Sequence, residues 1–273
     1  MPDPTHPTAH LVQLDIAWED PQANFDAVDR LLTAAPVNPG DIVLLPEMFA
    51  VGFSLNTDVT ADRGETLQYL QRLAEDTGAL VQGGRPVRPC DCDKALNRMS
   101  ALDGSATPPR LLAEYDKIHP FSFAREPEAF TGGDTIVTYQ WGGASGLAVA
   151  PIICYDLRFP ELFRLAALQG AECFALGACW PRTRQHHWRA LAIARAIECQ
   201  AFMLACNRTG NDPFLEYAGG SIVIDPQGNV LGELGDEEGV LSVEIDPGAA
   251  RAWREQFPVL RDAKLLKRTP GTA

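Results

Sequence analysis

The sequence LAVAPIICYDLRFP, residues 147–160, predicts a buried strand, a tight turn and the start of a helix. Leu147–Ile153 is apolar throughout, as in strands that are buried on both faces of a sheet. Cys154 follows the strand directly, and Pro160 suits the first position of a helix that we expect to end near Gly170. The next strand is expected at Glu172–Leu176. This part of the chain therefore alternates strand and helix, which is the pattern of an α/β fold.

The same alternation extends along the rest of the chain. Asp20 and Pro21 predict a helix start, because Asp is a preferred N-cap and Pro favours the first helical position. This helix has its apolar face over Phe25–Leu32, and further helices are expected at Leu67–Leu73 (ending at Gly78) and Gln185–Cys199. Strands are expected at Leu11–Trp18, Ile42–Leu45, Leu80–Gln82, Thr135–Trp141, Phe202–Asn207 and Val240–Ile245. Hairpins are expected to turn through Asp103-Gly104, Gly142-Gly143 and Pro226-Gln227-Gly228-Asn229, and residues 118–133 are expected to form a loop. They predict an α/β fold in which two mixed sheets pack together with helices outside, as one domain over residues 1–273.

The charge of the chain excludes several classes of function. Its 273 residues include 23 Lys and Arg and 36 Asp and Glu, which give a net charge of -13. That charge repels nucleic-acid phosphates and anionic membrane surfaces, and no block of basic residues opposes it. We therefore expect a small-molecule substrate, with no nucleic-acid partner and no membrane partner.

Targeting and metal signals are also lacking in the sequence. The N-terminus MPDPTHPTAH does not resemble a signal peptide, and no apolar run approaches the roughly 20 residues that span a bilayer. A cytoplasmic location is expected, where thiols stay reduced, so most of the seven Cys are predicted to be small core residues. Cys90-Asp91-Cys92 has no second Cys pair or spaced His to complete a metal site. We predict a surface loop there, and no metal or organic cofactor.

Three reactive side chains each follow a buried strand, where α/β proteins place catalytic groups: Glu47, Lys117 and Cys154. A thiol near a cation at such a turn can be largely thiolate at neutral pH, although the sequence does not fix the pKa of Cys154. It would attack an amide carbonyl, with Glu47 as general base and with Lys117 and the backbone N–H of Tyr155 as donors to the oxyanion. A cysteine–histidine pair that uses His119 is the alternative nucleophilic arrangement.

Three segments carry a resemblance to a known family: LLPEMF (44–49), YDKIHPF (115–121) and CYDLRFPELFR (154–164). In order and spacing they resemble the signature motifs of the nitrilase, or carbon–nitrogen hydrolase, superfamily, over roughly residues 10–258, with a C-terminal tail after them. The resemblance implies a four-layer α-β-β-α sandwich, a homodimer or higher homo-oligomer, and a catalytic triad of Glu47, Lys117 and Cys154. It also implies a second glutamate, between the lysine and the cysteine in sequence, that contacts the lysine and helps to position the substrate. Glu126 is favoured for this role by its distance from Gly133-Asp134, and Glu128 competes with it.

Four further segments are similar to bacterial omega-amidases: LVQLDIAWEDPQANFDAV (11–28), MFAVGFS (48–54), ARAIECQAFMLACNRTGND (194–212) and DPQGNVLGE (225–233). This similarity implies hydrolysis of the terminal amide of 2-oxoglutaramate or 2-oxosuccinamate, which gives the 2-oxo diacid and ammonia through a thioester on Cys154. A nitrilase, an N-carbamoyl amide hydrolase and a catalytically silent interaction module are the alternatives.

Aromatic and basic residues near these motifs are candidates for substrate binding. The aromatic candidates are Phe49, Phe53, Phe121 and Trp180. Arg158 either binds a substrate carboxylate through two hydrogen bonds or fixes the turn after Cys154. In a protein of charge -13 an anionic substrate needs a local cation, which Arg158, Arg182 or Arg184 can supply.

Overall fold

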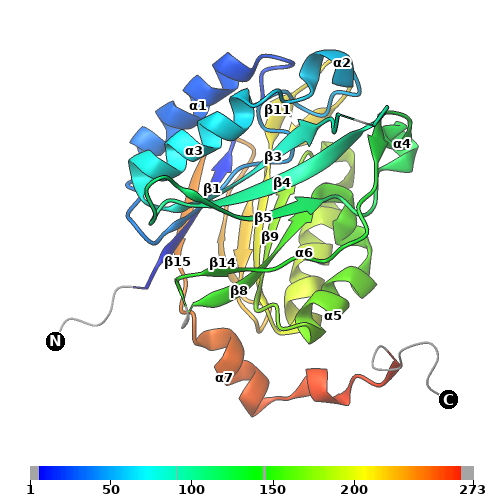
Figure 1. Cartoon of the computed structure of the whole chain (residues 1–273). Helices are drawn as coiled ribbons and strands as arrows, with labels where there is room; N and C mark the ends of the chain where they lie inside the picture. The colour runs from blue at the N-terminus through cyan, green and yellow to red at the C-terminus, as the bar shows by residue number, and fades with distance from the viewer. Residues whose placement is uncertain (1–5, 91, 144–145, 266–273) are drawn as a thin grey trace.

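Two β-sheets form the centre of the molecule, as the computed structural model in Figure 1 shows. The structure describes residues 6–90, 92–143 and 146–265. The first sheet contains, in spatial order, β15 (Gly239–Glu244), β1 (Thr8–Gln13), β2 (Ile42–Leu44), β3 (Leu80–Val87), β4 (Ala95–Asp103) and β5 (Arg110–Asp116), with β6 (Phe130–Thr131) paired to β4. The second contains β14 (Val230–Glu233), β13 (Ile222–Ile224), β10 (Phe202–Asn207), β9 (Cys173–Ala178), β8 (Leu147–Ile153) and β7 (Tyr139–Trp141). A separate pair contains β11 (Thr209–Asn211) and β12 (Glu216–Ala218).

Helices cover the outer face of each sheet, so the molecule has four layers. The first sheet is covered by α1 (Pro21–Thr33) and α3 (Glu65–Thr77), and the second by α5 (Pro160–Leu168) and α6 (Gln185–Cys199) (Figure 1). The other helices are α2 (Thr57–Thr60), α4 (Glu126–Ala129), α7 (Ala249–Gln256) and the 3-10 helices η1 (Ser122–Ala124), η3 (Cys154–Arg158), η4 (Arg182–Arg184) and η5 (Val259–Asp262). The predicted α-β-β-α sandwich is confirmed.

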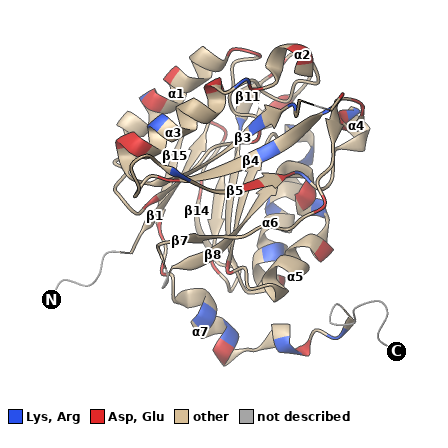
Figure 2. Ribbon diagram, in the orientation of Figure 1, with Lys and Arg blue, Asp and Glu red and all other residues tan. Residues whose placement is uncertain are grey.

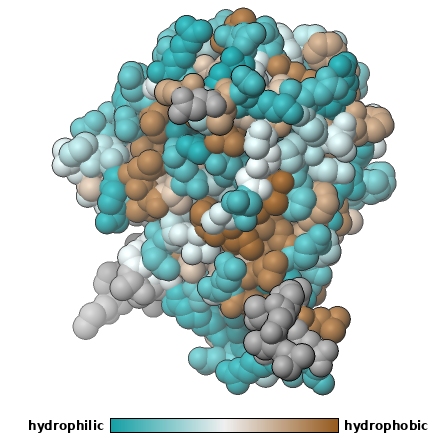
Figure 3. Space-filling model, turned by 45° about the vertical axis from the view of Figure 1, so that its right-hand side comes forward, coloured by the Kyte–Doolittle hydropathy of each residue, from teal (hydrophilic) through white to brown (hydrophobic). Residues whose placement is uncertain are grey.

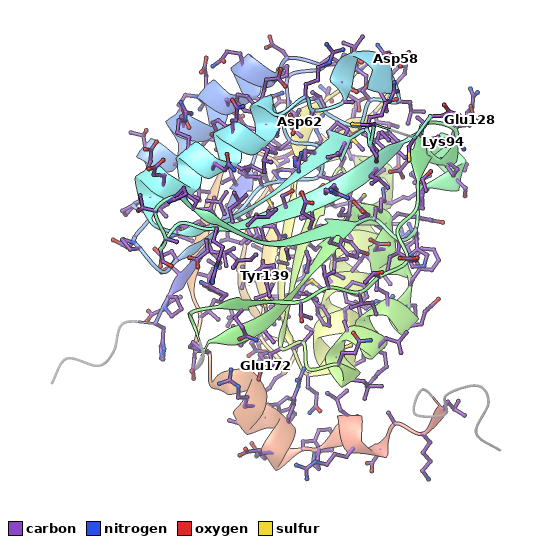
Figure 4. The ribbon with its side chains drawn as sticks, viewed as in Figure 1. Asp58, Asp62, Lys94, Glu128, Tyr139 and Glu172 are labelled. Carbon is purple, nitrogen blue, oxygen red and sulfur yellow. The ribbon has the colours of Figure 1, made fainter. Side chains whose placement is uncertain are left out.

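Apolar side chains fill the three spaces between these layers. Representative residues are Val28, Val43 and Leu70 between the first sheet and its helices, Leu44, Val149 and Leu204 between the sheets, and Phe163, Phe174 and Trp188 between the second sheet and its helices. Gln82 in β3 also links the two sheets, because its side-chain amide donates to the Ala175 carbonyl at 3.0 Å and accepts from the Tyr139 hydroxyl at 2.7 Å. Figure 4 shows Tyr139 in the middle of the molecule.

Several predicted elements are confirmed at their termini. The Asp20 side chain accepts a hydrogen bond from Ala23 N at 3.1 Å, which caps the N-terminus of α1. Gly78 follows α3 with a left-handed φ of 68°, a conformation that Gly adopts without steric cost. The helix Gln185–Cys199 and the strand Phe202–Asn207 have the predicted bounds. Local capping and periodicity are therefore good guides in this chain.

Other predicted bounds are wrong. The strand expected at Leu11–Trp18 ends at Gln13, because its neighbour β15 extends no further than Gly239, opposite Gln13. The strand expected at Thr135–Trp141 is only Tyr139–Trp141, the three residues that pair with β8. The expected loop at 118–133 contains η1, α4 and β6, and α2, α7 and the pair β11–β12 were not predicted. Short elements of this kind depend on tertiary partners that local sequence does not reveal.

Charged residues are spread over the molecule. Figure 2 shows Lys and Arg interspersed with Asp and Glu on helices and loops rather than gathered on one face. None of the helices in the described part of the chain is long and apolar enough to cross a membrane. The charged groups that matter for chemistry are instead buried, at the ends of β2, β5 and β8.

Candidate active site

Lys117 lies between two buried carboxylates just beyond the end of β5. Its Nζ is 2.8 Å from Glu47 Oε1 and 2.8 Å from Glu126 Oε2, and all three side chains are at most 1% exposed. Burial on its own would lower the pKa of Lys117, but the negative charges of Glu126 and Glu47 outweigh that effect and hold the pKa well above its ordinary value. Lys117 therefore stays an ammonium that fixes both carboxylates.

Glu47, just beyond the end of β2, is held by donors from three directions. Its Oε1 accepts from Lys117 Nζ at 2.8 Å and from Asn97 Nδ2 at 2.7 Å, and its Oε2 accepts from the backbone N–H of Cys179 at 3.0 Å. Pro46 and the parallel strands on either side of β2 fix the direction in which the chain leaves the sheet. The carboxylate is thus oriented before any substrate arrives.

Glu126, rather than Glu128, is the second glutamate of this cluster. Glu126 begins α4, is fully buried and also accepts from Asn97 Nδ2 at 2.9 Å. Glu128 points to the surface near Lys94 (Figure 4) and pairs with Arg125, with 59% of its side chain exposed. The two candidates that the sequence left open are therefore separated by burial.

Cys154 follows β8 with a backbone φ of 42°, in the left-handed region that residues other than Gly rarely occupy. Strained backbone conformations of this kind cluster at functional sites. Here the strain lies at the sharp turn between strand and helix that presents the Cys154 side chain. Cys154 is 8% exposed. Burial raises the pKa of its thiol, the charge of Glu47 raises it further, and Lys117 lowers it by less. The resting thiolate that the sequence allowed is therefore not favoured here, because burial and Glu47 outweigh the cation.

Asp156 fixes the turn that carries Cys154. It is fully buried, and its carboxylate accepts from the Tyr115 hydroxyl at 2.7 Å and from Ile153 N at 3.3 Å. The same carboxylate contacts His119 Nδ1 at 2.7 Å, while the His119 ring stacks on Phe159 with 3.6 Å between centroids. His119 is thus engaged by Asp156 and Phe159 and does not line the pocket that contains the thiol. The structure does not support the alternative cysteine–histidine pair.

A small pocket, partly open to solvent, lies over the thiol. Its lining residues are Phe53, Lys117, Phe121, Ala124, Cys154, Tyr155, Arg158, Cys179, Trp180, Pro181, Arg184, Leu215 and Tyr217. Phe53, Phe121 and Trp180 are where the sequence predicted them. Phe49 is not: it is fully buried between the first sheet and its helices, 6.0 Å from the Phe25 ring. The nearby Phe53 lies with its ring 5.4 Å from Lys117 Nζ.

Two of the three candidate arginines line this pocket. Arg158 lies over the Trp180 ring at 4.8 Å, and Arg184 lies over the Phe121 ring at 5.6 Å. Within residues 6–90, 92–143 and 146–265, neither guanidinium forms an ion pair with a carboxylate. Arg182 points elsewhere, toward Glu216 at 3.6 Å and Asp236 at 3.4 Å. The two pocket arginines are thus available to an anionic ligand.

The oxyanion donors predicted from the sequence face the same pocket. Lys117 and Tyr155 both line it. Tyr155 is the second residue of η3, and N–H groups in the first turn of a helix have no acceptor within that helix. Its backbone N–H is therefore suited to bind a negatively charged oxygen beside Cys154.

Asn97 is a site residue that the sequence analysis missed. It lies in β4, is 1% exposed, and its amide group donates to Glu47 and Glu126 together. A neutral donor between two carboxylates lowers their repulsion without adding a second cation. The sequence does contain a signal for Asn97: it is a polar residue on the same face of its strand as the apolar residues Ala95, Met99 and Ala101. Such a residue on the apolar side of a strand indicates a buried polar contact.

No group of three or more His, Cys, Asp or Glu in the described part of the chain could hold a metal ion. Cys90 and Cys92 are exposed, and Asp91 between them lies outside the described residues.

Comparison with known proteins places these features in a family. The model of the carbon-nitrogen hydrolase family matches residues 8–255. The chain is 34% identical to the 2-oxoglutaramate amidase of Bacillus subtilis (strain 168), over 94% of this chain and 97% of that protein. It is 32% identical to the omega-amidase YafV of Escherichia coli (strain K12), over 93% of this chain and 95% of that protein.

Solved structures agree with this match. XC1258 from Xanthomonas campestris, a CN-hydrolase superfamily protein with an arsenic adduct in its active site, superposes with a TM-score of 0.86 at 32% identity, over 95% of this chain and 97% of that one. An amidase from Nesterenkonia sp. AN1, with acrylamide added at its active-site cysteine, has a TM-score of 0.77 at 26% identity, over 93% of this chain and 98% of that one. The chain belongs to the carbon–nitrogen hydrolase family, whose members hydrolyse carbon–nitrogen bonds.

Proposed function

We propose that the protein is an amidase that hydrolyses the terminal amide of a small 2-oxo acid amide, 2-oxoglutaramate or 2-oxosuccinamate. One observation carries the proposal: a cysteine, a buried lysine and two arginines with no carboxylate partner among the described residues line one pocket, together with five aromatic residues. The cysteine and lysine suit acyl transfer, and the arginines suit a carboxylate on the substrate. The names of the relatives from Bacillus subtilis and Escherichia coli support the same substrate class.

In the first half of the reaction, Cys154 Sγ attacks the amide carbon and Glu47 takes the thiol proton. Because the pKa of this thiol is raised, the proton leaves as the sulfur–carbon bond forms rather than beforehand. Lys117 Nζ and the Tyr155 N–H stabilise the oxyanion of the tetrahedral intermediate. Glu47 then gives its proton to the leaving nitrogen, ammonia departs, and a thioester remains on Cys154.

In the second half, water attacks the thioester carbon and Glu47 accepts a proton from that water. Collapse of the second tetrahedral intermediate breaks the sulfur–carbon bond, returns the proton to Cys154 and releases the 2-oxo diacid. Glu126 and Asn97 take no part in bond changes in this scheme. They are positioning residues that hold Lys117 and Glu47.

Product analysis separates this substrate class from the others in the family. We expect ammonia and the 2-oxo diacid from 2-oxoglutaramate and 2-oxosuccinamate, with a higher kcat/KM than for any nitrile or N-carbamoyl amine. A carbamoyl substrate would also release carbon dioxide. Faster turnover of a nitrile or carbamoyl compound would overturn the substrate but leave the cysteine mechanism in place. A silent interaction module would turn over none of these compounds.

The pocket arginines give a prediction with a matched control. Replacing Arg158 or Arg184 by Ala is expected to raise KM for the anionic amide by about 10- to 100-fold, because a charge-assisted hydrogen bond contributes about 1.5–3 kcal/mol. Arg182→Ala removes a nearby arginine that pairs with Glu216 and Asp236, and it should change KM by less than about twofold. Steady-state kinetics measure all three variants. Unchanged KM in both pocket variants would exclude the carboxylate contact.

The homo-oligomer and the cytoplasmic location stay predictions. Figure 3 shows hydrophobic side chains gathered in a band across one face of the molecule. Ile197 in α6 and Phe257 after α7 are 52% and 54% exposed. A contiguous apolar band, rather than single exposed residues, is the kind of surface that associates with another subunit.

A further inference from the structure

A second thiol, that of Cys179, lines the same pocket as Cys154. We propose that these two cysteines form a reversible disulfide when the protein meets hydrogen peroxide, so that the pocket is a redox-modification site in addition to its proposed amidase role. The inference stands on the geometry of the two thiols and does not require that the substrate assignment be right.

The sheet brings the two cysteines together. β8 and β9 are parallel neighbours in which Ile153 lies opposite Gly177. Cys154 is the next residue after Ile153, and Cys179 is two residues after Gly177. Adjacent strands are about 4.8 Å apart, and cysteines that form disulfides have Cα atoms about 4.4–6.8 Å apart. The ends of two neighbouring strands therefore bring these two residues to the same pocket.

Glu47 contacts both cysteines. Cys179 donates its backbone N–H to Glu47 Oε2 at 3.0 Å and its thiol to the Glu47 carbonyl at 3.2 Å. On the other side, the negative charge of the Glu47 carboxylate helps to raise the pKa of Cys154, so the carboxylate also lies near that thiol. One residue thus lies against both sulfur-bearing side chains.

The other cysteines are poor partners. Cys173, Cys199 and Cys206 are fully buried in the apolar layers of the fold. Cys90 and Cys92 are exposed and do not line the pocket. Cys154 and Cys179 are 8% and 6% exposed at the pocket surface, where a molecule as small as peroxide can reach them. Among the cysteines in the described residues, this pair alone lines the pocket.

The chemistry proceeds in two balanced steps. The Cys154 sulfur attacks one oxygen of hydrogen peroxide while Glu47 takes the thiol proton and passes it to the departing hydroxide. The sulfur becomes a sulfenic acid, and the second oxygen leaves as water. The Cys179 sulfur then attacks the sulfenic sulfur, the sulfur–oxygen bond breaks, and the hydroxyl leaves as water with the Cys179 proton. A thiol reductant reverses the modification by thiol–disulfide exchange.

Peptide mapping tests the proposal directly. The full chain, with Cys90→Ser and Cys92→Ser to remove the surface thiols, is treated with hydrogen peroxide, alkylated and digested without reduction. We expect a linked peptide pair that contains Cys154 and Cys179, and its disappearance after dithiothreitol. Cys179→Ser and Cys179→Ala in the same background should instead accumulate sulfinic acid on Cys154, which dithiothreitol does not reverse.

Activity gives a second reading, with each variant compared with its own untreated sample. Peroxide is expected to inactivate every variant, and dithiothreitol to restore activity only where Cys179 is present. Sulfinic acid on Cys154 with no linked peptide in the parent, at the same rate as in the Cys179 variants, would overturn the proposal. The mapping result stands even if the protein proves inactive on 2-oxo acid amides, so failure of the redox proposal and failure of the proposed function are distinguishable.

Discussion

Replacing Cys154 by Ala is expected to lower kcat for 2-oxoglutaramate by at least about 10⁴-fold, because removing a catalytic nucleophile can cost about 10⁶-fold. Cys154 lines the pocket beside Lys117, with Glu47 in place to receive the thiol proton. The substitution removes one sulfur atom and keeps the same backbone chemistry, so the fold should persist. Ammonia release and the midpoint of thermal unfolding are to be measured on the same preparation.

The neighbouring thiol provides the control for this experiment. Cys179→Ala also removes one sulfur from the pocket, but it keeps the backbone N–H that donates to Glu47. It should lose far less activity than Cys154→Ala. Equal turnover by the parent and Cys154→Ala would overturn the mechanism. Loss of activity together with a large drop in the unfolding midpoint would show a folding defect instead.

Replacing Glu47 by Gln is expected to lower kcat/KM by about 10²–10⁴-fold, which is the range that general acid–base catalysis contributes. The Gln side chain has the same shape and keeps one oxygen that can accept from Lys117 or from the Cys179 N–H. It cannot take the thiol proton. Glu128→Gln is the matched control, because Glu128 is exposed and contacts Arg125 at the surface, and its activity should stay within about twofold of the parent.

The pH dependence of Glu47→Gln has a definite sign. Burial raises the pKa of Cys154, so its thiol is protonated at neutral pH, and without Glu47 the thiolate must form by loss of the proton to solvent. The fraction of thiolate then increases about tenfold per pH unit below the pKa. Residual activity should therefore rise steeply with pH, whereas the parent, in which Glu47 removes the proton, should not show this rise. A flat profile for the variant would exclude Glu47 as the acceptor of that proton.

The sequence predicted the fold and the main reactive groups because both depend on local pattern. Buried strands are continuous apolar runs, and Glu47, Lys117 and Cys154 each stand directly beyond one. The structure brings the first two within 2.8 Å of each other and places Cys154 in the same pocket as Lys117. A reactive residue directly after a buried strand therefore indicates a site residue on physical grounds, independently of the family motif that contains it.

The sequence could not show how deeply the site is buried. The sequence allowed a thiolate on the basis of a cation near Cys154 but had no measure of desolvation, which acts on the pKa in the opposite direction and more strongly. Glu126 and Glu128 are two residues apart, and only the start of α4 decides which one turns inward. Phe49 and Phe53 likewise flank one turn, and only Phe53 reaches the pocket. Such choices are made by packing between distant segments.

The groups that we propose act in catalysis come from different sheets. Glu47 and Lys117 follow strands of the first sheet, whereas Cys154 follows a strand of the second. Neither sheet with its own helices contains a complete set of reacting groups. In a folding or denaturation experiment, each half could hold its backbone hydrogen bonds while the enzyme is still inactive. Catalysis would then begin only when the two halves dock, so activity should vanish early when denaturant loosens the apolar layer between them, ahead of the loss of helices and strands.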